Sequence, residues 1–225
     1  MQQFLLRCGV AAPVIYLLTV LLGGAITPGY SHVRQVIGAL TAPGAPHRQL
    51  LELCFLAYNV ATLLFAFGLL WRLWVCRRRN LTVGALLLAG VAICGIFMFF
   101  APTDAPEGPA TLQGQLSIAL DAARSLLIFL SILVMGLGFR GVPGVSFLWG
   151  YSVVSAVLTG MAGLMAAAGS AVRSPLLGVY DRVAMGAFLL WMLVLALVLA
   201  RVEPQPQPQP QPAPPPEEPE GPAEA

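Results

Sequence analysis

The chain has 225 residues, of which 58% are hydrophobic and only 10% are charged. Soluble domains carry roughly a quarter charged residues, and the mean hydropathy of this chain is +0.81. The composition therefore excludes a soluble enzyme or a soluble binding domain, and it indicates an integral membrane protein.

The charges divide the chain into two parts. All 12 basic residues are arginines, and all 12 fall within residues 1–202 together with 5 acids, which gives this part a charge of +7. The tail from Glu203 onward has 5 acids and no base, so its charge is −5. Nucleic-acid binding is not expected, because it requires a basic patch on a soluble surface, whereas these arginines are spread along an apolar chain.

Six apolar stretches are long enough to cross a membrane, which takes about 20 apolar residues per helix. They cover approximately residues 8–26, 50–71, 81–101, 116–138, 145–168 and 183–200. Each stretch is apolar on nearly every side, as is typical of a helix surrounded by lipid and other helices. The sequence therefore predicts an all-α integral membrane protein whose residues 1–202 form a bundle of six transmembrane helices.

The arginines also predict the orientation of the bundle, because short cytoplasmic loops are enriched in basic residues. With six spans, one side of the membrane holds seven arginines and no acid before the tail: Arg7, Arg72, Arg77, Arg78, Arg79, Arg140 and Arg201. The other side holds the remaining five arginines and all five acids of residues 1–202. We therefore expect a protein of the cytoplasmic membrane with both termini inside the cell.

Residues 203–225 form a tail of low complexity that contains 10 of the 19 prolines. Proline alternates with glutamine over residues 204–212, which favours an extended, polyproline-like chain without internal hydrogen bonds. We expect a disordered cytoplasmic tail. It is either a solvated chain without a partner or a docking segment for a proline-recognising protein.

Two predicted spans carry polar stripes. In the fourth span, four polar residues share one helical face, namely Ser117, Asp121, Arg124 and Ser125. Asp121 and Arg124 are near enough on the helix to pair directly. In the second span, Glu52, Asn59 and Thr62 form another stripe, and Arg48 precedes Glu52 by one turn and can pair with it. Such residues usually face the interior of a bundle or a cavity, since lipid does not solvate them.

The stripes allow two interpretations. In the first, they join into one polar pocket that opens outward under the loops carrying His32, His47 and Asp104. In the second, they are two local ion pairs at the level of the lipid headgroups, together with one interhelical contact of Asn59. The predicted span limits support the second interpretation, because they place the charged residues within two turns of the interface, where long side chains can reach water.

The fifth predicted span has small residues at a spacing of four. Ser152, Ala156 and Gly160 share one face of this helix, while a second face carries Ser155, Thr159 and Gly163. Small residues allow helices to approach closely in lipid. We therefore interpret both faces as packing surfaces without a role in ligand binding.

Signatures of catalysis and of cofactors are largely absent. A zinc hydrolase requires three protein ligands and an open position, but the chain has two histidines, which Asp104 or Glu52 would have to complete. The sequence has neither a Gly-x-Ser-x-Gly nor a His-Glu-x-x-His motif. The four cysteines form no close pair and no metal-binding spacing. We therefore expect no cofactor and no catalytic residue.

Several short segments resemble the domain-of-unknown-function 998 family of six-span bacterial and archaeal membrane proteins. They are Pro-Gly-Tyr-Ser-His at 28–32, Gln-Val-Ile-Gly-Ala-Leu at 35–40, Gly-Ala-Pro at 44–46, Phe-Ala-Pro-Thr-Asp at 100–104 and Tyr-Asp-Arg at 180–182. The resemblance spans residues 8–200. It implies six helices and no established activity, and a more distant likeness to eukaryotic autophagy modulators suggests a link to lipid organisation. Where relatives often have a His-Gly-x-x-His element, this chain has Gln113-Gly114-Gln115-Leu116-Ser117, so a metal site there is not expected.

These observations predict a membrane protein that binds or senses a lipid headgroup or a small amphiphile at its outer polar cluster. Arg124 and Arg182 would hold a phosphate group, and Asp121 and Asp181 would orient the two arginines. One alternative is a small-molecule transporter. Another is a metal-assisted hydrolase that uses His32, His47 and Asp104.

Overall fold

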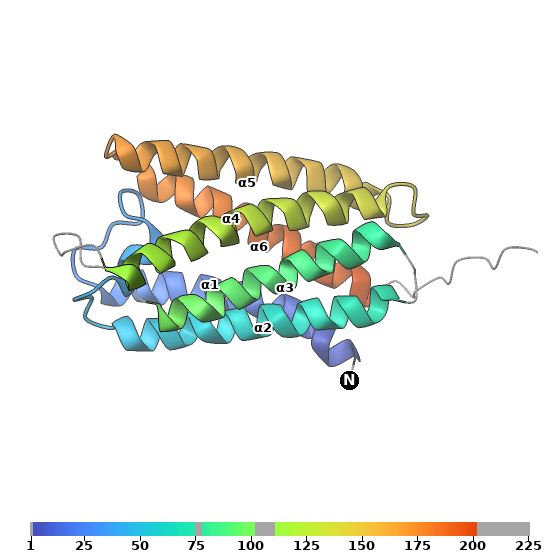
Figure 1. Ribbon diagram of the computed structural model, residues 1–225, viewed down its shortest axis with the longest axis horizontal. Coiled ribbons are helices and arrows are strands. Elements are labelled where there is room, and N and C mark those ends of the chain that lie inside the picture. Colours follow the sequence, from blue (N-terminus) through green and yellow to red (C-terminus); the bar gives the residue numbers. More distant parts are fainter. Residues whose placement is uncertain (1, 75–77, 102–110, 202–225) are drawn as a thin grey trace, which may run out of the picture.

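A computed structural model describes residues 2–74, 78–101 and 111–201 (Figure 1). Over these residues the chain is helical and has no strand. The six long helices and one short 3-10 helix (η1) are α1 (Gln2–Ile26), η1 (Ile37–Thr41), α2 (Arg48–Trp74), α3 (Arg79–Phe100), α4 (Leu112–Phe139), α5 (Phe147–Ala171) and α6 (Leu177–Arg201). All six α-helices are long and apolar enough to cross a membrane. The prediction of an all-α protein with six spans is therefore confirmed.

The helices extend beyond the predicted spans, and two of these extensions affect the site. Helix α4 begins at Leu112, four residues before the predicted start, because the Thr111 hydroxyl caps it by accepting a hydrogen bond from the backbone N–H of Gly114 at 3.1 Å. Helix α6 begins at Leu177 instead of residue 183. Apolar content alone does not reveal polar first turns, which are stabilised by caps and side-chain partners. Both changes place the charged residues of these helices further from the helix start than we predicted.

The helices form a ring in which each packs against the next in the chain and α6 packs back against α1. Helices α1, α3 and α5 end where α2, α4 and α6 begin, and we call this side the loop end of the bundle (left in Figure 1). At the opposite end the helices are closely packed. A Cβ added to Gly84 of α3 would lie 2.7 Å from the Cβ of Met135 in α4, so only glycine allows this approach.

Large side chains fill the bundle toward the end opposite the loops. Phe65, Phe139, Phe188 and Trp191 are at most 2% exposed and belong to one apolar core cluster. The indole N–H of Trp191 donates to the Ser152 hydroxyl at 2.9 Å, which joins α6 to α5. Ser152 thus has the packing role that we predicted, whereas residues nearer the loop end of α5 line the cavity described below.

Helices α4 and α5 diverge toward the loop end (Figure 1). At the opposite end they are in close contact, since a Cβ on Gly136 of α4 would lie 2.5 Å from the Cβ of Ser152 in α5. Most of α4 between Leu112 and Leu127 is exposed or half-buried, with Gly114 and Ser117 as its buried positions. The ring is therefore tight at one end and open between α4 and α5 at the other.

Candidate functional site

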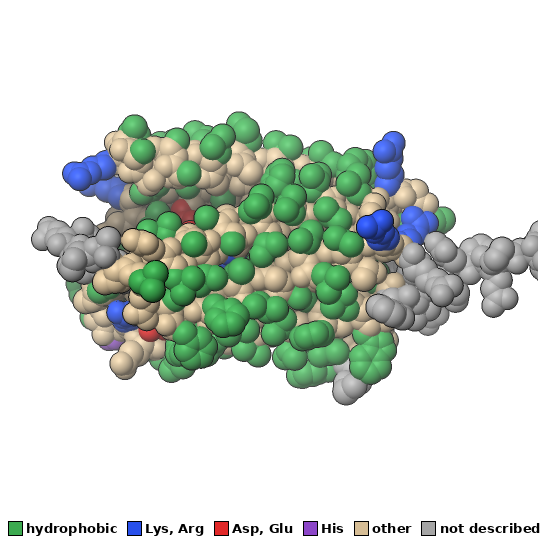
Figure 2. Space-filling model, viewed as in Figure 1, with side chains coloured by type: hydrophobic (Ala, Val, Ile, Leu, Met, Phe, Trp, Pro, Cys, Tyr) green, Lys and Arg blue, Asp and Glu red, His purple; other side chains and the backbone are tan. Residues whose placement is uncertain are grey.

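The loop end of the bundle contains a cavity of about 920 Å³, which is lined by residues from all six α-helices and from η1. Ligand sites in proteins commonly enclose about 300–1,000 Å³, so this cavity has room for a sizeable ligand. Figure 2 shows the surface hollowed between α4 and α5 on this side, with acidic side-chain atoms visible inside. Apolar side chains cover most of the flank around the hollow (Figure 2).

Five of the ten residues that we predicted for the site line this cavity together. They come from three helices and are Glu52, Asn59, Asp121, Arg124 and Asp181. The other five lie elsewhere. Arg48 lies at the rim, His32 and Arg182 lie in the loop contacts described below, and His47 is exposed in the turn before α2. Asp104 lies outside the residues that the structure describes.

Arg124 projects from α4 into the centre of the ring. Its guanidinium carbon lies 5.9 Å from the centroid of the Tyr58 ring in α2, a helix that α4 does not otherwise approach. The Nε atom of Arg124 and the hydroxyl of Tyr58 are buried, and neither has a hydrogen-bond partner among the described residues. The Arg124 guanidinium and the Tyr58 side chain therefore interact across the interior of the bundle, while the Nε of Arg124 keeps no partner.

The position of Arg124 along α4 and its contact with Tyr58 argue against the interpretation as a local ion pair with Asp121. Arg124 lies in the fourth turn of α4, about 18 Å along the helix axis from Leu112 at 1.5 Å per residue. Tyr58 is ten residues into α2 and Tyr16 is ten residues before the end of α1, so all three lie at a similar level. Helix α4 starts four residues earlier than its apolar content indicated, so Arg124 lies more than three turns from the start of the helix. Its side chain faces the cavity.

The two aspartates lie in the same electrostatic environment as Arg124. Asp121, Arg124 and Asp181 interact electrostatically with one another and with Tyr16. The direct ion pair predicted between Asp121 and Arg124 does not form, since the one salt bridge among the described residues joins Arg48 to Glu52. The Arg124 side chain extends toward the Tyr58 ring and leaves the Asp121 carboxylate facing the cavity.

Asp181 and Asn59 are each partly committed to the protein. The Asp181 Oδ2 atom accepts a hydrogen bond from the backbone N–H of Ile37 at 2.7 Å, which attaches η1 to α6. The Asn59 amide donates to the Phe55 carbonyl at 2.9 Å, while its Oδ1 atom is buried against Gly95 of α3 without a partner. Each side chain therefore retains one oxygen that the protein does not use.

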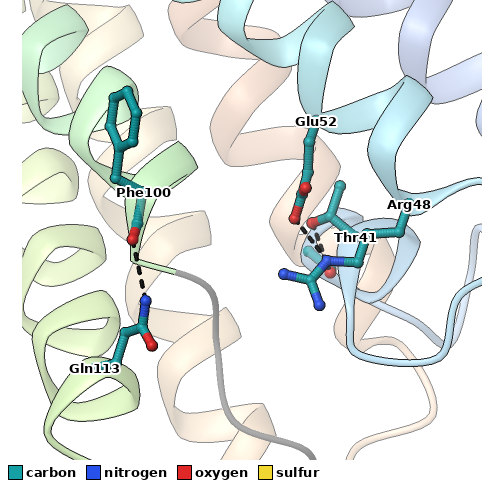
Figure 3. Close-up of polar contacts among 6 residues, drawn as sticks. Thr41, Arg48, Glu52, Phe100 and Gln113 are labelled. Atoms are coloured by element: carbon teal, nitrogen blue, oxygen red, sulfur yellow. Dashed lines mark hydrogen bonds and ion pairs between the residues drawn. The ribbon is translucent and has the colours of Figure 1, made fainter.

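Two polar contacts lie at the rim of the cavity (Figure 3). The Nε atom of Arg48 donates to Glu52 Oε1 at 2.7 Å, so the ion pair predicted on α2 is present. The Gln113 side-chain amide donates to the Phe100 carbonyl at 3.1 Å. Gln113, which stands where the family resemblance led us to look for a histidine, thus joins the start of α4 to the end of α3.

A second cluster of contacts fastens the loop between α1 and α2 to the start of α6. The Arg182 guanidinium donates to the carbonyls of Gln35 at 2.9 Å and Gly178 at 2.8 Å, and it also bonds the Tyr30 hydroxyl. Its NH2 group lies 3.1 Å from His32 Nδ1. We call this set the loop clamp. Arg182 holds the loop in place and does not line the cavity.

The loop clamp is close-packed and supports the cavity wall. A Cβ on Gly178 would lie 2.5–2.8 Å from the carbonyl oxygens of His32, Val33 and Gln35, so glycine is required for the loop to lie against α6. Burial raises the pKa of Tyr30, although the nearby Arg182 opposes the rise. A neutral Tyr30 hydroxyl can donate to the Val36 carbonyl, 3.1 Å away, while it accepts from Arg182. The next residues, from Val36 onward, line the cavity.

The sequence did not identify the aromatic and small residues that shape the cavity. Tyr16 and Tyr58 belong to apolar stretches and have the composition of an ordinary core. On α5, Thr159, Gly160 and Gly163 line the cavity, although we predicted these positions to be packing surfaces. Small residues give close packing where helices converge and space where they diverge, and the sequence does not distinguish the two.

The metal-site alternative finds no support in the part of the chain that the structure describes. That part contains no group of three or more His, Cys, Asp or Glu side chains close enough to hold a metal ion. A ring nitrogen of His32 is engaged by Arg182. Cys8, Cys54 and Cys94 are free thiols.

The fold defines a multi-pass helical membrane protein, with a cavity at the loop end of the bundle that both polar and apolar side chains line. The chain belongs to the family described as protein of unknown function (DUF998), whose model matches residues 10–198. The match includes every residue that lines the cavity and the whole loop clamp. Comparison with curated proteins and with solved structures finds no match.

Proposed function

We propose that the protein binds an amphiphile in this cavity, with the polar head of the ligand at Arg124 and its apolar chain along the cavity walls. The observation that carries the proposal is the position of Arg124. It is a cation inside the membrane-spanning part of the bundle, with a buried Nε that has no partner, and it faces a space large enough for a ligand. Ionisable residues at this depth usually mark a ligand or ion site.

The lining suits a molecule with one polar and one apolar part. Around the charged groups the walls are largely apolar, with Phe55, Leu56, Met98, Ile128 and Phe129 among them. Ligand pockets typically combine such walls with a few polar groups that fix the orientation. A soluble polar ligand would leave most of this apolar surface uncovered.

The opening between α4 and α5 supports access from the lipid. Ile118 on α4 and Leu164 on α5 both line the cavity, and both are about 70% exposed on the flank of the bundle. An apolar chain can pass between these side chains while the head remains at Arg124. This geometry favours a lipid or a lipid-like amphiphile over a ligand that arrives through water.

Two observations favour binding over transport. The bundle is filled by Phe65, Phe139 and Trp191 on the side opposite the cavity, so no passage continues from it among the described residues. Each of the six long helices is also continuous, whereas many transporters place their sites at broken helices near the membrane midplane. Sensing or holding a ligand fits a cavity that is closed at one end.

We also propose the orientation that the arginines indicate, with both termini in the cytoplasm. The cavity then faces the outer leaflet of the cytoplasmic membrane, and the ligand comes from that leaflet. The proline-rich tail from residue 203 would lie on the other side, where it could dock a proline-recognising protein. Ligand binding on the outer side of the membrane and docking of a protein on the cytoplasmic side would together suit a sensor.

A pair of glycine variants on α5 tests the proposal. Gly163 lines the cavity and a Cβ added there meets nothing within 4 Å, whereas Gly150 on the same helix is equally unobstructed and does not line the cavity. Gly163→Leu should fill the site and lower the amount of co-purified lipid several-fold, while Gly150→Leu should retain the wild-type amount. Native mass spectrometry of protein extracted from its membrane measures both. If the two variants retain equal amounts of lipid, the cavity is not the binding site.

A further inference from the structure

The charged groups of the cavity are not balanced among themselves. Four charged side chains line it, and these are Glu52, Asp121, Arg124 and Asp181. Glu52 is neutralised by its ion pair with Arg48. Two carboxylates and one guanidinium remain, and no ion pair joins them in the described structure. Arg182, which does not line the cavity, also interacts electrostatically with Asp181.

Each of these three groups has bonding capacity that the protein leaves unused. Asp121 makes no hydrogen bond among the described residues, and Asp181 uses Oδ2 for Ile37. The Nε of Arg124 is buried without a partner, as is the hydroxyl of Tyr58, a residue that is 0% exposed. Buried polar groups in folded proteins are nearly always bonded. The buried Nε of Arg124 therefore indicates a bond that a ligand supplies, whereas the exposed carboxylate of Asp121 is open to a ligand without requiring one.

The balance of charge distinguishes between classes of headgroup. A purely anionic head would bond Arg124 but would also bring a negative charge beside two carboxylates. A purely cationic head would bond the carboxylates and leave the guanidinium unpaired at its depth in the bundle. A head that carries both charges satisfies all three groups.

The character of the acceptors also distinguishes between two kinds of cation. Carboxylates bind an ammonium best when it donates N–H hydrogen bonds to them. A quaternary ammonium has no such donor and is typically held by aromatic faces. In this cavity the Tyr58 face is already occupied by the Arg124 guanidinium. Other aromatic residues line the walls, so the preference for a primary ammonium rests on the two carboxylates.

We infer that the cavity binds a zwitterionic amphiphile whose head joins a phosphate to a primary ammonium. The phosphate lies at Arg124 and the Tyr58 hydroxyl, and the ammonium lies between Asp121 and Asp181. This inference rests on the proposed function and adds the class of ligand to it. The opening between α4 and α5 and the apolar walls favour the lipid over the free headgroup as its source.

Competition between lipids in nanodiscs tests the inference. The purified protein is equilibrated with equal amounts of phosphatidylethanolamine, phosphatidylcholine and phosphatidylglycerol that share the same acyl chains, and the bound lipid is read by native mass spectrometry. Wild type should prefer phosphatidylethanolamine about tenfold, as expected for one additional charge-assisted hydrogen bond. Asp121→Asn should remove its preference over phosphatidylcholine. Arg140→Gln, which removes an arginine near Trp149 at the opposite end of the bundle, should keep the preference.

The outcomes separate the inference from the function on which it rests. Preferential retention of phosphatidylglycerol or phosphatidylcholine, or equal retention of all three lipids, would overturn the zwitterionic site and leave amphiphile binding standing. A folded wild-type protein without any bound lipid would overturn both. Displacement of the lipid by free phosphoethanolamine at equal concentration would show that the headgroup alone is the ligand. An unchanged melting temperature of Asp121→Asn confirms that its altered preference does not come from unfolding.

Discussion

Replacement of Arg124 by leucine is expected to raise the stability of the lipid-free protein and to abolish its lipid binding. An arginine near the centre of a membrane helix costs about 2.5–3.5 kcal/mol, and here its Nε has no partner to offset that cost. Leucine removes the unpaired charge and adds apolar volume to an apolar wall. We expect the free energy of unfolding to rise by about 2 kcal/mol.

Thermal unfolding in detergent, followed by circular dichroism after lipid removal, measures this gain, and native mass spectrometry measures the loss of lipid. Arg140→Leu is the matched control, because Arg140 is exposed at the opposite end of the bundle. Arg140→Leu should change neither the melting temperature nor the amount of bound lipid by much. A lower melting temperature for Arg124→Leu without lipid would mean that the guanidinium holds the helices together, and the argument for a ligand site would lose its basis.

The second large effect is expected at Arg182, where glutamine should destabilise the protein. The substitution removes the donors that hold Tyr30, His32 and Gln35 against α6. Hydrogen bonds to a charged group contribute about 1.5–3 kcal/mol each, and the acceptors left behind lose their partner. We expect a loss of about 3 kcal/mol or more in the free energy of unfolding.

Hydrogen exchange provides the specific readout, because backbone amides of residues 30–37 should exchange faster in Arg182→Gln than in wild type. Arg173→Gln is the control. Arg173 is exposed in the turn before α6 and lies outside the loop clamp. If Arg182→Gln exchanged like Arg173→Gln over residues 30–37, the loop would be held by packing alone.

The six helices could be predicted from the sequence because lipid imposes a simple requirement on the chain. A span must be about 20 residues long and apolar around its circumference, and neither property depends on tertiary contacts. The stripes that carry Asp121, Arg124, Glu52 and Asn59 followed from helical periodicity in the same way. The structure brings all four to one cavity.

The parts that could not be predicted depend on contacts distant in the sequence. Arg182 has the composition and position of a ligand-binding residue, but the loop folds back onto α6 and occupies its two terminal nitrogens, while its Nε is buried without a partner. Gly160 and Gly163 could pack or leave space, and the divergence of α4 from α5 decides which. The distance of Arg124 from the start of α4 depended on a cap at Thr111 that apolar content does not reveal.

Photo-crosslinking tests the central claim, that the cavity holds an amphiphile, most directly. The full-length protein is purified in nanodiscs that contain a phospholipid with a diazirine on its acyl chain close to the headgroup, and crosslinked peptides are identified by mass spectrometry. We predict labels on cavity residues of α4 and α5, such as Ser125 and Gly160, and their loss in Arg124→Leu. Labels confined to flank residues such as Phe97 and Leu190, which are exposed and do not line the cavity, would contradict the claim.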